Sequence, residues 1–253
     1  MTSKKESQPK KKKINNFPYD FVKVTGIIPA WIWLRPKLHY VSDKAKQRVK
    51  GGVLFAGNHS TFIDPIAAHL AFWYRRMRCL ATKDLYNTPA KARMFTLMNC
   101  IMVDKENFNI GSLHDAIDAL KDDQAVLIFP EGGVNRKTDE VKSFKSGVIL
   151  MAHLGKKPIV PFYIVKPKKW YNRYHIVIGE QINVQEMCGK IPTVEELEKM
   201  STHLHDKEVE LATYYEQYAK RKQKTADVEV NVVADVEAEI AVEAEQQPAT
   251  ENE

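Results

Sequence analysis

The chain has 253 residues, of which 44% are hydrophobic and 28% are charged. This composition excludes a wholly disordered chain and a polytopic membrane protein, and the length fits one catalytic domain with appendages. The formal net charge is +6, but nine acidic and no basic residues follow Ala226, so the rest of the chain carries +15. A basic surface of this kind favours nucleic acid, anionic lipid headgroups or phosphorylated substrates as partners.

The N-terminal residues 1–16 are polar and lysine-rich, and we expect them to form a disordered basic arm. No apolar core with a small-residue cleavage site follows this arm, which argues against a secretory signal peptide and predicts a cytoplasmic protein. The three cysteines, Cys79, Cys100 and Cys188, are too few and too widely spaced for a disulfide framework or a zinc cluster. A reducing compartment agrees with that count.

Residues 17–34 form the most apolar stretch of the chain. They are too short for a membrane-spanning helix, which needs about 20 largely apolar residues, and prolines and charged residues interrupt them. Trp31 and Trp33 near their end, with basic residues behind, favour a helix that lies in a membrane interface. A helix docked on the core is an equally good interpretation, and both stay open. We assign residues 17–49 to a helical membrane-interface segment.

Short apolar runs of strand length alternate with helical patterns between residues 50 and 224. One helix is predicted to begin at Ser112, with Asp115 in its first turn, and a last helix at Thr193, where Thr-x-x-Glu forms a capping box. This alternation predicts an α/β domain over residues 50–224, with a mostly parallel sheet flanked by helices. Residues 225–253 lack packing aromatics, and we expect an acidic disordered tail there. The strands are predicted at residues 53–56, 78–81, 101–103, 125–129, 159–165 and 174–178.

His59 and Asp64 follow the first of these strands and lie five residues apart. On one helix, five residues turn through about 500°, so the two side chains would point about 140° apart. They can meet only if His59 lies in the turn after the strand and Asp64 lies in or near the first turn of the next helix. A histidine held beside a carboxylate is a general-base arrangement. The alternative is a surface histidine next to a helix-capping aspartate.

A second strand end reads Phe129-Pro130-Glu131-Gly132-Gly133. Adjacent glycines after a buried strand let backbone N–H groups approach an anion, and Arg136 and Lys137 follow closely. The segment is a candidate phosphate-binding turn, and the same glycines would also suit a turn that only reverses the chain. The sequence contains no P-loop, dinucleotide-binding or common serine-hydrolase motif.

Four segments together resemble the motifs of the glycerolipid acyltransferase family, the 1-acylglycerol-3-phosphate acyltransferases and their relatives. Residues 58–64 match the first motif, Asn-His-x-x-x-x-Asp, and residues 129–132 match the start of the third, Phe-Pro-Glu-Gly. Residues 101–105 and 157–162 resemble the second and fourth motifs. Order and spacing agree over roughly residues 17–180, so the four motifs jointly form a strong signal.

Two positions depart from the family pattern. The third motif normally continues Glu-Gly-Thr-Arg, whereas Gly133 and Val134 occupy the last two positions here, and the nearest guanidinium is that of Arg136. The second motif ends in Lys105 where the family usually has arginine. The lysine ammonium is a point charge and lacks the bidentate geometry of a guanidinium. Both changes affect the groups that hold the acceptor phosphate in the family, so they bear on the identity of the acceptor more than on the type of reaction.

The resemblance implies transfer of an acyl group from acyl-CoA or acyl carrier protein to the hydroxyl of a lysophospholipid. The foremost acceptor is lysophosphatidate, which would be converted to phosphatidate in phospholipid biosynthesis. In that scheme His59 removes the hydroxyl proton, and Asp64 orients the imidazole and balances its charge. The scheme needs no acyl-enzyme, no metal and no redox cofactor, and the cysteines are structural in it.

The resemblance also implies which residues bind the acceptor. Lys105 and Arg136 would hold its phosphate, and the turn at Glu131, Gly132 and Gly133 would shape the pocket. The reaction would take place at the cytoplasmic face of a membrane, and the protein would be peripheral or monotopic. No nucleic acid is expected as a partner.

Two other functions remain compatible with the residues. One is a related acyltransferase with another acceptor, such as glycerol-3-phosphate, another lysophospholipid or a lipid amine. The other is a basic membrane-binding module without catalysis, which the lysine-rich arm and the charge of +15 would suit. Such a module would not need His59, whereas a transferase would lose its activity without it.

Overall fold

A computed structural model describes residues 16–104, 110–135, 141, 143–167, 169 and 171–246, with only the backbone described for residues 110 and 226–246. The chain divides into two compact units, Met1–Leu211 and Ala212–Glu253. The first unit contains the sheet and the helices around it, and the second is helical as far as Gln246. Lys105, Arg136 and all but the last residue of the expected basic arm lie outside the described residues.

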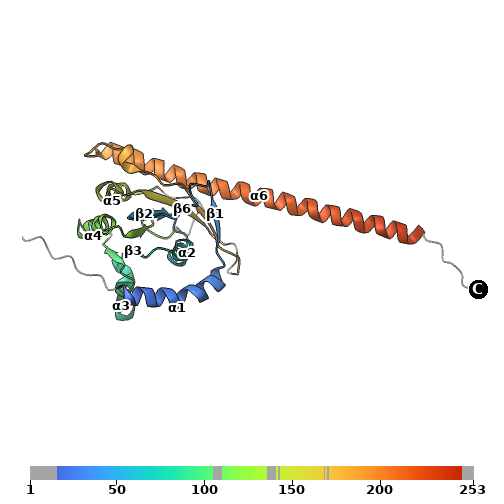
Figure 1. Cartoon of the computed structure of the whole chain (residues 1–253), viewed down its shortest axis with the longest axis horizontal. Helices are drawn as coiled ribbons and strands as arrows, with labels where there is room; N and C mark the ends of the chain where they lie inside the picture. Colours follow the sequence, from blue (N-terminus) through green and yellow to red (C-terminus); the bar gives the residue numbers. More distant parts are fainter. Residues whose placement is uncertain are drawn as a thin grey trace, which may run out of the picture. The chain divides into compact units, whose positions relative to one another are not determined.

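In the described part of the chain, seven strands form one sheet in the order β1-β7-β6-β2-β5-β3-β4 (Figure 1). All neighbouring strands are parallel except β6 and β7, which are antiparallel. This result confirms the prediction of an α/β domain with a mostly parallel sheet. The strands are β1 (Lys37–Tyr40), β2 (Val53–Gly57), β3 (Met77–Thr82), β4 (Ile101–Val103), β5 (Ala125–Ile128), β6 (Ile159–Val165) and β7 (His175–Ile178).

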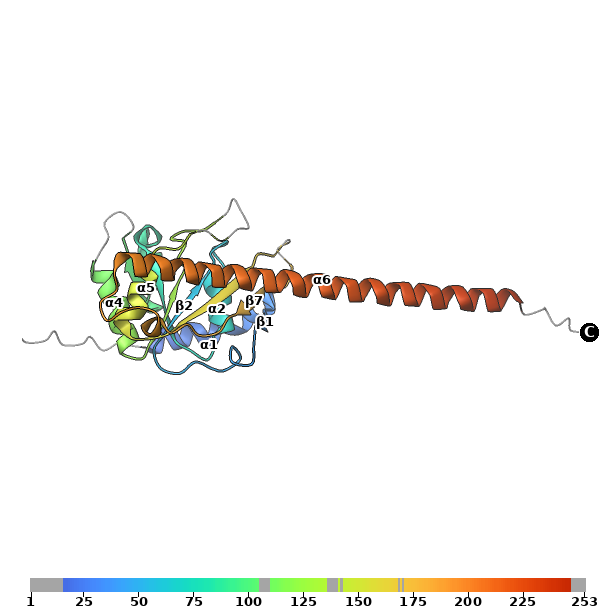
Figure 2. The ribbon, with the colours of Figure 1, turned by 90° about the horizontal axis from the view of Figure 1, so that it is seen from above.

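Different helices cover the two faces of the sheet, as Figures 1 and 2 show. Helices α1 and α2 pack on the face that carries Phe55, and α4, α5 and the start of α6 pack on the face that carries Leu54. Successive residues of β2 therefore point into two separate cores, as the period of two in a strand requires. The helices are α1 (Phe17–Leu34), α2 (Asp64–Ala71), α3 (Pro89–Leu97), α4 (Ile110–Lys121), α5 (Gly147–Gly155) and α6 (Val194–Gln246), with short 3-10 helices η1 (Lys83–Tyr86) and η2 (Val184–Glu186).

The six strands predicted from apolar runs are all present, and β1 was not predicted. Its sequence, Lys-Leu-His-Tyr, has no apolar run, and its place at the edge of the sheet depends on pairing with β7, far along the chain. The expectation of a helical segment over residues 17–49 is therefore wrong beyond Leu34, because β1 lies within that range.

The predicted start of α4 was also wrong, because the helix begins at Ile110 and Ser112 is a buried residue inside it. Ser112 and Asp115 are three residues apart, a spacing that also fits two neighbours on one helix face. The local pattern therefore could not distinguish a cap from two positions within the helix.

The capping box at the start of α6 is confirmed. The Thr193 N–H donates to Glu196 Oε2 at 2.8 Å, and the Glu196 N–H donates to Thr193 Oγ1 at 3.2 Å. The helix then continues to Gln246, where we expected disorder from residue 225. Residues 225–246 contain no glycine or proline and are rich in alanine and glutamate, both of which have high helix propensity. Residues 247–253 lie outside the described residues.

Helix α1 docks on the domain along one side. The hydroxyl of buried Tyr19 accepts the Met77 N–H at 3.0 Å, and Leu34 is buried in the core. Asp20 binds the guanidinium of Arg76 through two hydrogen bonds of 2.7 Å. Within the described residues, no helix combines the length and the apolar character that crossing a membrane requires.

The opposite side of α1 carries exposed apolar side chains at helical spacing. We call Phe17, Phe21, Val24, Ile28 and Ile32 the α1 stripe; between 61% and 75% of each of these residues is exposed. Successive members are three or four residues apart, so they follow one face of the helix. The helix is thus docked and still presents an apolar surface.

Candidate active site

His59 and Asp64 meet between β2 and α2. Strand β2 ends at Gly57 and α2 begins at Asp64, so His59 lies in the connecting turn and Asp64 in the first helical turn. The His59 Nδ1 atom is 3.1 Å from Asp64 Oδ2. This is the arrangement that the five-residue spacing predicted.

The carboxylate of Asp64 is held by the turn itself. Its Oδ2 accepts the N–H groups of Ser60 at 2.6 Å and Thr61 at 2.7 Å, and its Oδ1 accepts the Thr61 hydroxyl at 2.6 Å. Asp64 is only 1% exposed, and these donors compensate the loss of water around its oxygens. The carboxylate therefore has a fixed position from which to orient the imidazole.

The imidazole of His59 is fixed on two sides. Asp64 engages Nδ1, and the ring of Phe129 stacks on the imidazole with centroids 4.3 Å apart and planes inclined by 20°. Phe129 comes from the end of β5, next to β2 in the sheet. Since Nδ1 is engaged, Nε2 is the ring nitrogen left for the cavity that His59 lines.

Two contacts from the turn after β5 hold the backbone of His59. Its N–H donates to Glu131 Oε1 at 3.1 Å, and its carbonyl oxygen accepts the N–H of buried Asn135 at 2.6 Å. Glu131 was expected to bind substrate, but its carboxylate faces the His59 backbone and the residue does not line the cavity. Gly132 and Gly133 do line it, and their part in binding substrate stays a prediction.

Asn58 connects the same turn to β6. Its side-chain amide donates to the Ile164 carbonyl at 2.9 Å and accepts the Ile164 N–H at 2.7 Å, so it extends the pairing of β2 with β6 by one residue. Asn58 is buried and does not face the cavity. Sequence reasoning gave no role to Asn58, Phe129 or Asn135, because their roles depend on neighbouring strands.

A cavity of about 1450 Å³ opens beside His59. Its lining includes the apolar residues Phe62, Ile66, Leu80 and Phe95 and the polar residues Ser143, Lys145 and His205. Such a combination of a large apolar wall with a few polar groups suits an amphipathic ligand. Val134, which stands where the family has an arginine, also lines it.

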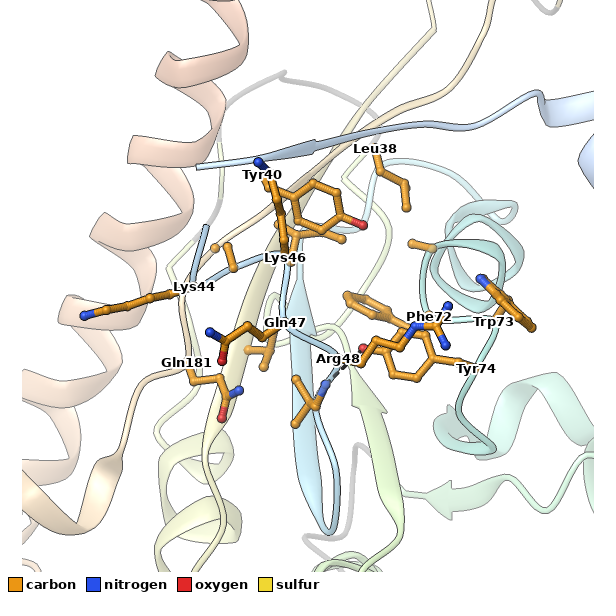
Figure 3. Close-up of a pocket in the computed structure, with 16 residues that line it drawn as sticks. Leu38, Tyr40, Lys44, Lys46, Gln47, Arg48, Phe72, Trp73, Tyr74 and Gln181 are labelled. Carbon is orange, nitrogen blue, oxygen red and sulfur yellow. Dashed lines mark hydrogen bonds between the residues drawn. The ribbon is translucent and has the colours of Figure 1, made fainter. Parts of the chain in front are cut away.

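A second, smaller cavity of about 120 Å³ lies near the segment that leads into β2 (Figure 3). It is lined by residues that precede β2 and by Gly179 and Gln181, which follow β7, whereas His59 follows the carboxyl end of β2. The guanidinium of Arg48 lies 5.3 Å from the ring centroids of both Trp73 and Tyr74. These contacts hold the exposed Arg48 side chain against two aromatic rings, and no histidine lines this cavity.

The cysteine thiols are not activated. Burial raises the pKa of the Cys79 and Cys188 thiols above its usual value and raises the pKa of Cys100 to about 11. A thiol that stays protonated at neutral pH is a poor nucleophile. This agrees with the structural role expected of all three cysteines.

Comparison with known protein families and sequences identifies relatives of this chain. A family model described as Acyltransferase matches residues 39–165. A Bacillus subtilis protein named 1-acyl-sn-glycerol-3-phosphate acyltransferase is 26% identical over 182 residues, which cover 70% of this chain and 89% of that protein. A Mycoplasma pneumoniae protein named probable 1-acyl-sn-glycerol-3-phosphate acyltransferase is 25% identical over 158 residues, which cover 59% of this chain and 58% of that protein.

A solved structure shares the fold. The crystal structure of the 1-acyl-sn-glycerophosphate (LPA) acyltransferase PlsC from Thermotoga maritima matches with a TM-score of 0.54 and 20% sequence identity, over 78% of this chain and 79% of that one. The residues matched by the family model, 39–165, include both His59 and Asp64 as well as the turn after β5.

Proposed function

Because this chain belongs to the acyltransferase family, we propose that it transfers a fatty acyl group from a thioester donor to the hydroxyl of a lysophospholipid, with lysophosphatidate as the acceptor. The observation that carries this proposal is the His59–Asp64 pair at the wall of a large, partly apolar cavity. The names of the B. subtilis and M. pneumoniae relatives support the choice of acceptor.

The geometry of the pair suggests how the reaction proceeds. Nε2 of His59 takes the proton of the acceptor hydroxyl as the oxygen attacks the thioester carbonyl. The buried carboxylate of Asp64 stabilises the imidazolium that forms. When the tetrahedral intermediate collapses, the carbon–sulfur bond breaks and the thiolate of acyl-CoA or acyl carrier protein takes the proton from His59. No side chain of the protein is acylated in this scheme.

The acceptor phosphate requires cations near the turn after β5. We assigned this role to Lys105 and Arg136 from the family resemblance, and both assignments stay predictions. Replacing either residue by alanine should raise the KM for a phosphorylated acceptor and leave the KM for a phosphate-free acceptor unchanged. Gly132 and Gly133, which line the cavity, would leave space for the headgroup.

The proposed substrates also require a membrane surface, because lysophosphatidate and its product are lipids. We propose that the protein binds the cytoplasmic face of a membrane through the α1 stripe without spanning the bilayer. The exposed apolar side chains of α1 support this role, as do the lysines of residues 1–16 in the sequence. Ile27 and Leu34 of the same helix pack against the core and do not belong to this exposed surface.

The decisive test is an acyl-transfer assay with purified full-length protein. One long-chain acyl-CoA is supplied with lysophosphatidate, another lysophospholipid, glycerol-3-phosphate or a monoacylglycerol. We expect lysophosphatidate to be acylated with the highest kcat/KM. If no acceptor is acylated, either from acyl-CoA or from the same acyl chain on acyl carrier protein, the proposed function fails and the alternative of a membrane-binding module without catalysis is favoured.

The His59→Ala variant tests the mechanism. It should lose activity by about 10²–10⁴-fold or more, because it removes the proposed general base, while its circular dichroism and melting temperature stay close to the wild type. His114→Ala is the matched control, since His114 is exposed on α4 and does not line the cavity. Near-normal turnover by folded His59→Ala protein contradicts the mechanism.

A further inference from the structure

The proposed acceptor places strict demands on the cavity. In lysophosphatidate the hydroxyl to be acylated and the phosphate lie on adjacent carbons of glycerol, so both must enter the cavity that His59 lines. A phosphate monoester is bound most strongly by charge-assisted hydrogen bonds. The aliphatic side chain of Val134 cannot donate a charge-assisted hydrogen bond. Among the described residues that line this cavity, Lys145 is the one lysine or arginine.

Lys145 lies against the turn that follows β5. Its backbone N–H donates to the Pro130 carbonyl at 3.3 Å, which brings the start of α5 back to this turn. A Cβ atom on Gly132 would lie 3.0 Å from Lys145 Cε and 3.3 Å from Nζ. The side chain of Lys145 therefore crosses the face of Gly132, and the absence of a side chain there gives the ammonium its space.

The charge of Lys145 is available to a ligand. Within the described residues, no carboxylate oxygen lies within ion-pair distance of its ammonium. Two acidic residues line the same cavity, Asp104 and Glu198. Asp104 pairs with Lys83 at 3.5 Å, and Glu198 is exposed on α6. Lys145 itself is exposed where it lines the cavity, so binding an anion does not require it to leave a partner.

We propose that the Lys145 ammonium binds the phosphate of the acceptor while His59 takes the proton from the neighbouring hydroxyl, an inference that rests on the function proposed above. Lys145 thus supplies a positive charge that Val134 cannot supply. It determines which headgroup is accepted and takes no part in the transfer of protons or acyl groups.

Steady-state kinetics of full-length protein test this role. Wild type and the variants Lys145→Ala, Lys145→Arg and Lys121→Ala are assayed with one acyl-CoA and with lysophosphatidate or monoacylglycerol, which lacks the phosphate. Loss of one charge-assisted hydrogen bond should raise the KM for lysophosphatidate by about 10-fold or more in Lys145→Ala, with little change in kcat. The kinetics with monoacylglycerol should not change, and Lys145→Arg should retain most of the affinity.

Lys121→Ala is the matched control, because it removes one positive charge from the exposed end of α4, away from the cavity. An unchanged KM for lysophosphatidate in Lys145→Ala, or equal losses with both acceptors, would overturn the inference and leave the proposed function intact. If wild-type protein does not acylate lysophosphatidate, the proposed function fails. A direct measurement of lysophosphatidate binding then tests whether Lys145 binds the phosphate. In the unreactive His59→Ala background, adding Lys145→Ala should raise the Kd for lysophosphatidate about 10-fold, and an unchanged Kd overturns the inference.

Discussion

The Asp64 carboxylate receives hydrogen bonds from two backbone N–H groups and one hydroxyl besides its contact with His59. An asparagine can satisfy the same geometry. Its carbonyl oxygen would take the place of Oδ2 and its NH₂ group would donate to the hydroxyl of Thr61. Asp64→Asn therefore removes the charge and keeps the turn, which separates the electrostatic role of the residue from its structural role.

We expect Asp64→Asn to lower kcat by about 10³-fold, because an uncharged partner no longer stabilises the imidazolium. The melting temperature should remain near the wild-type value, since each hydrogen bond of the turn has a substitute. Single-turnover rates and thermal melts of the same preparation provide the measurement. A large loss of stability together with normal kcat in the folded fraction would show that Asp64 only holds the turn.

The spacing of His59 and Asp64 predicted their contact because helix geometry leaves one way for them to meet. The other residues of the site gave no such local signal. Glu131 was assigned to substrate from its motif, although its carboxylate binds the His59 backbone from a neighbouring strand end. Lys145 lies 13 positions after Gly132 in the sequence, and only the return of the chain to α5 brings them together.

At the scale of elements, α1 shows why sequence left two interpretations open. The same helix buries Tyr19 and Leu34 against the domain and exposes the α1 stripe on its other side. Its apolar residues therefore belong to two different surfaces, and composition alone cannot assign them. The interpretation of a docked helix is supported by the structure, and membrane binding by the stripe stays a proposal.

The double variant Phe21→Asp with Ile28→Asp tests that proposal. Full insertion of each side chain into a membrane interface would contribute about 1.5 to 3 kcal/mol, and an aspartate would also be repelled by anionic lipid. Binding to anionic liposomes, measured by flotation, should fall by at least 10-fold. For the wild type, salt should weaken binding without abolishing it, because salt screens only the lysine contribution.

The control for that experiment is Leu154→Asp. Leu154 is an exposed apolar residue on α5, which covers the other face of the sheet from α1. This variant should float with the liposomes as the wild type does. If the double variant floats equally well, α1 does not bind the membrane and serves only as a docked helix.

At the scale of the whole domain, one buried acid should set how stability depends on pH. Glu208 on α6 has an exposure of 0%, and neither of its carboxylate oxygens has a hydrogen-bond partner among the described residues. Burial, together with the nearby charge of Glu131, raises the pKa of Glu208 well above its ordinary value. No local pattern marks it, since its neighbours Asp206 and Val209 are exposed.

The sign of the effect follows from the protons bound in each state. Between the unfolded and the folded pKa, the folded state keeps a proton on Glu208 that the unfolded state has released, so stability falls as pH rises through this range. Glu208→Gln has no proton to lose there. It should melt higher than the wild type at about pH 8, by roughly 2 to 4 °C per kcal/mol gained, and the difference should shrink toward about pH 4.

Thermal melts across this pH range provide the measurement, with Glu210→Gln as a control on the exposed side of the same helix. The control should follow the wild-type dependence on pH. Parallel curves for the wild type and Glu208→Gln would contradict the raised pKa of Glu208.

The edge of the sheet next to α1 is built from the two ends of the domain sequence. His39 on β1 contacts His175 on β7 at 2.9 Å, across 136 residues of chain, and the Tyr174 N–H donates to the Leu34 carbonyl at the end of α1. A ribosome that adds about 5–20 residues per second needs roughly 7 to 27 s to make that intervening stretch. During that time α1 has already been synthesised, but Tyr174 and β7, which complete the contacts at the end of α1, have not. If the α1 stripe binds a membrane as proposed, a nearby bilayer therefore has the first opportunity to receive the helix, and the rest of the domain would assemble onto it afterwards.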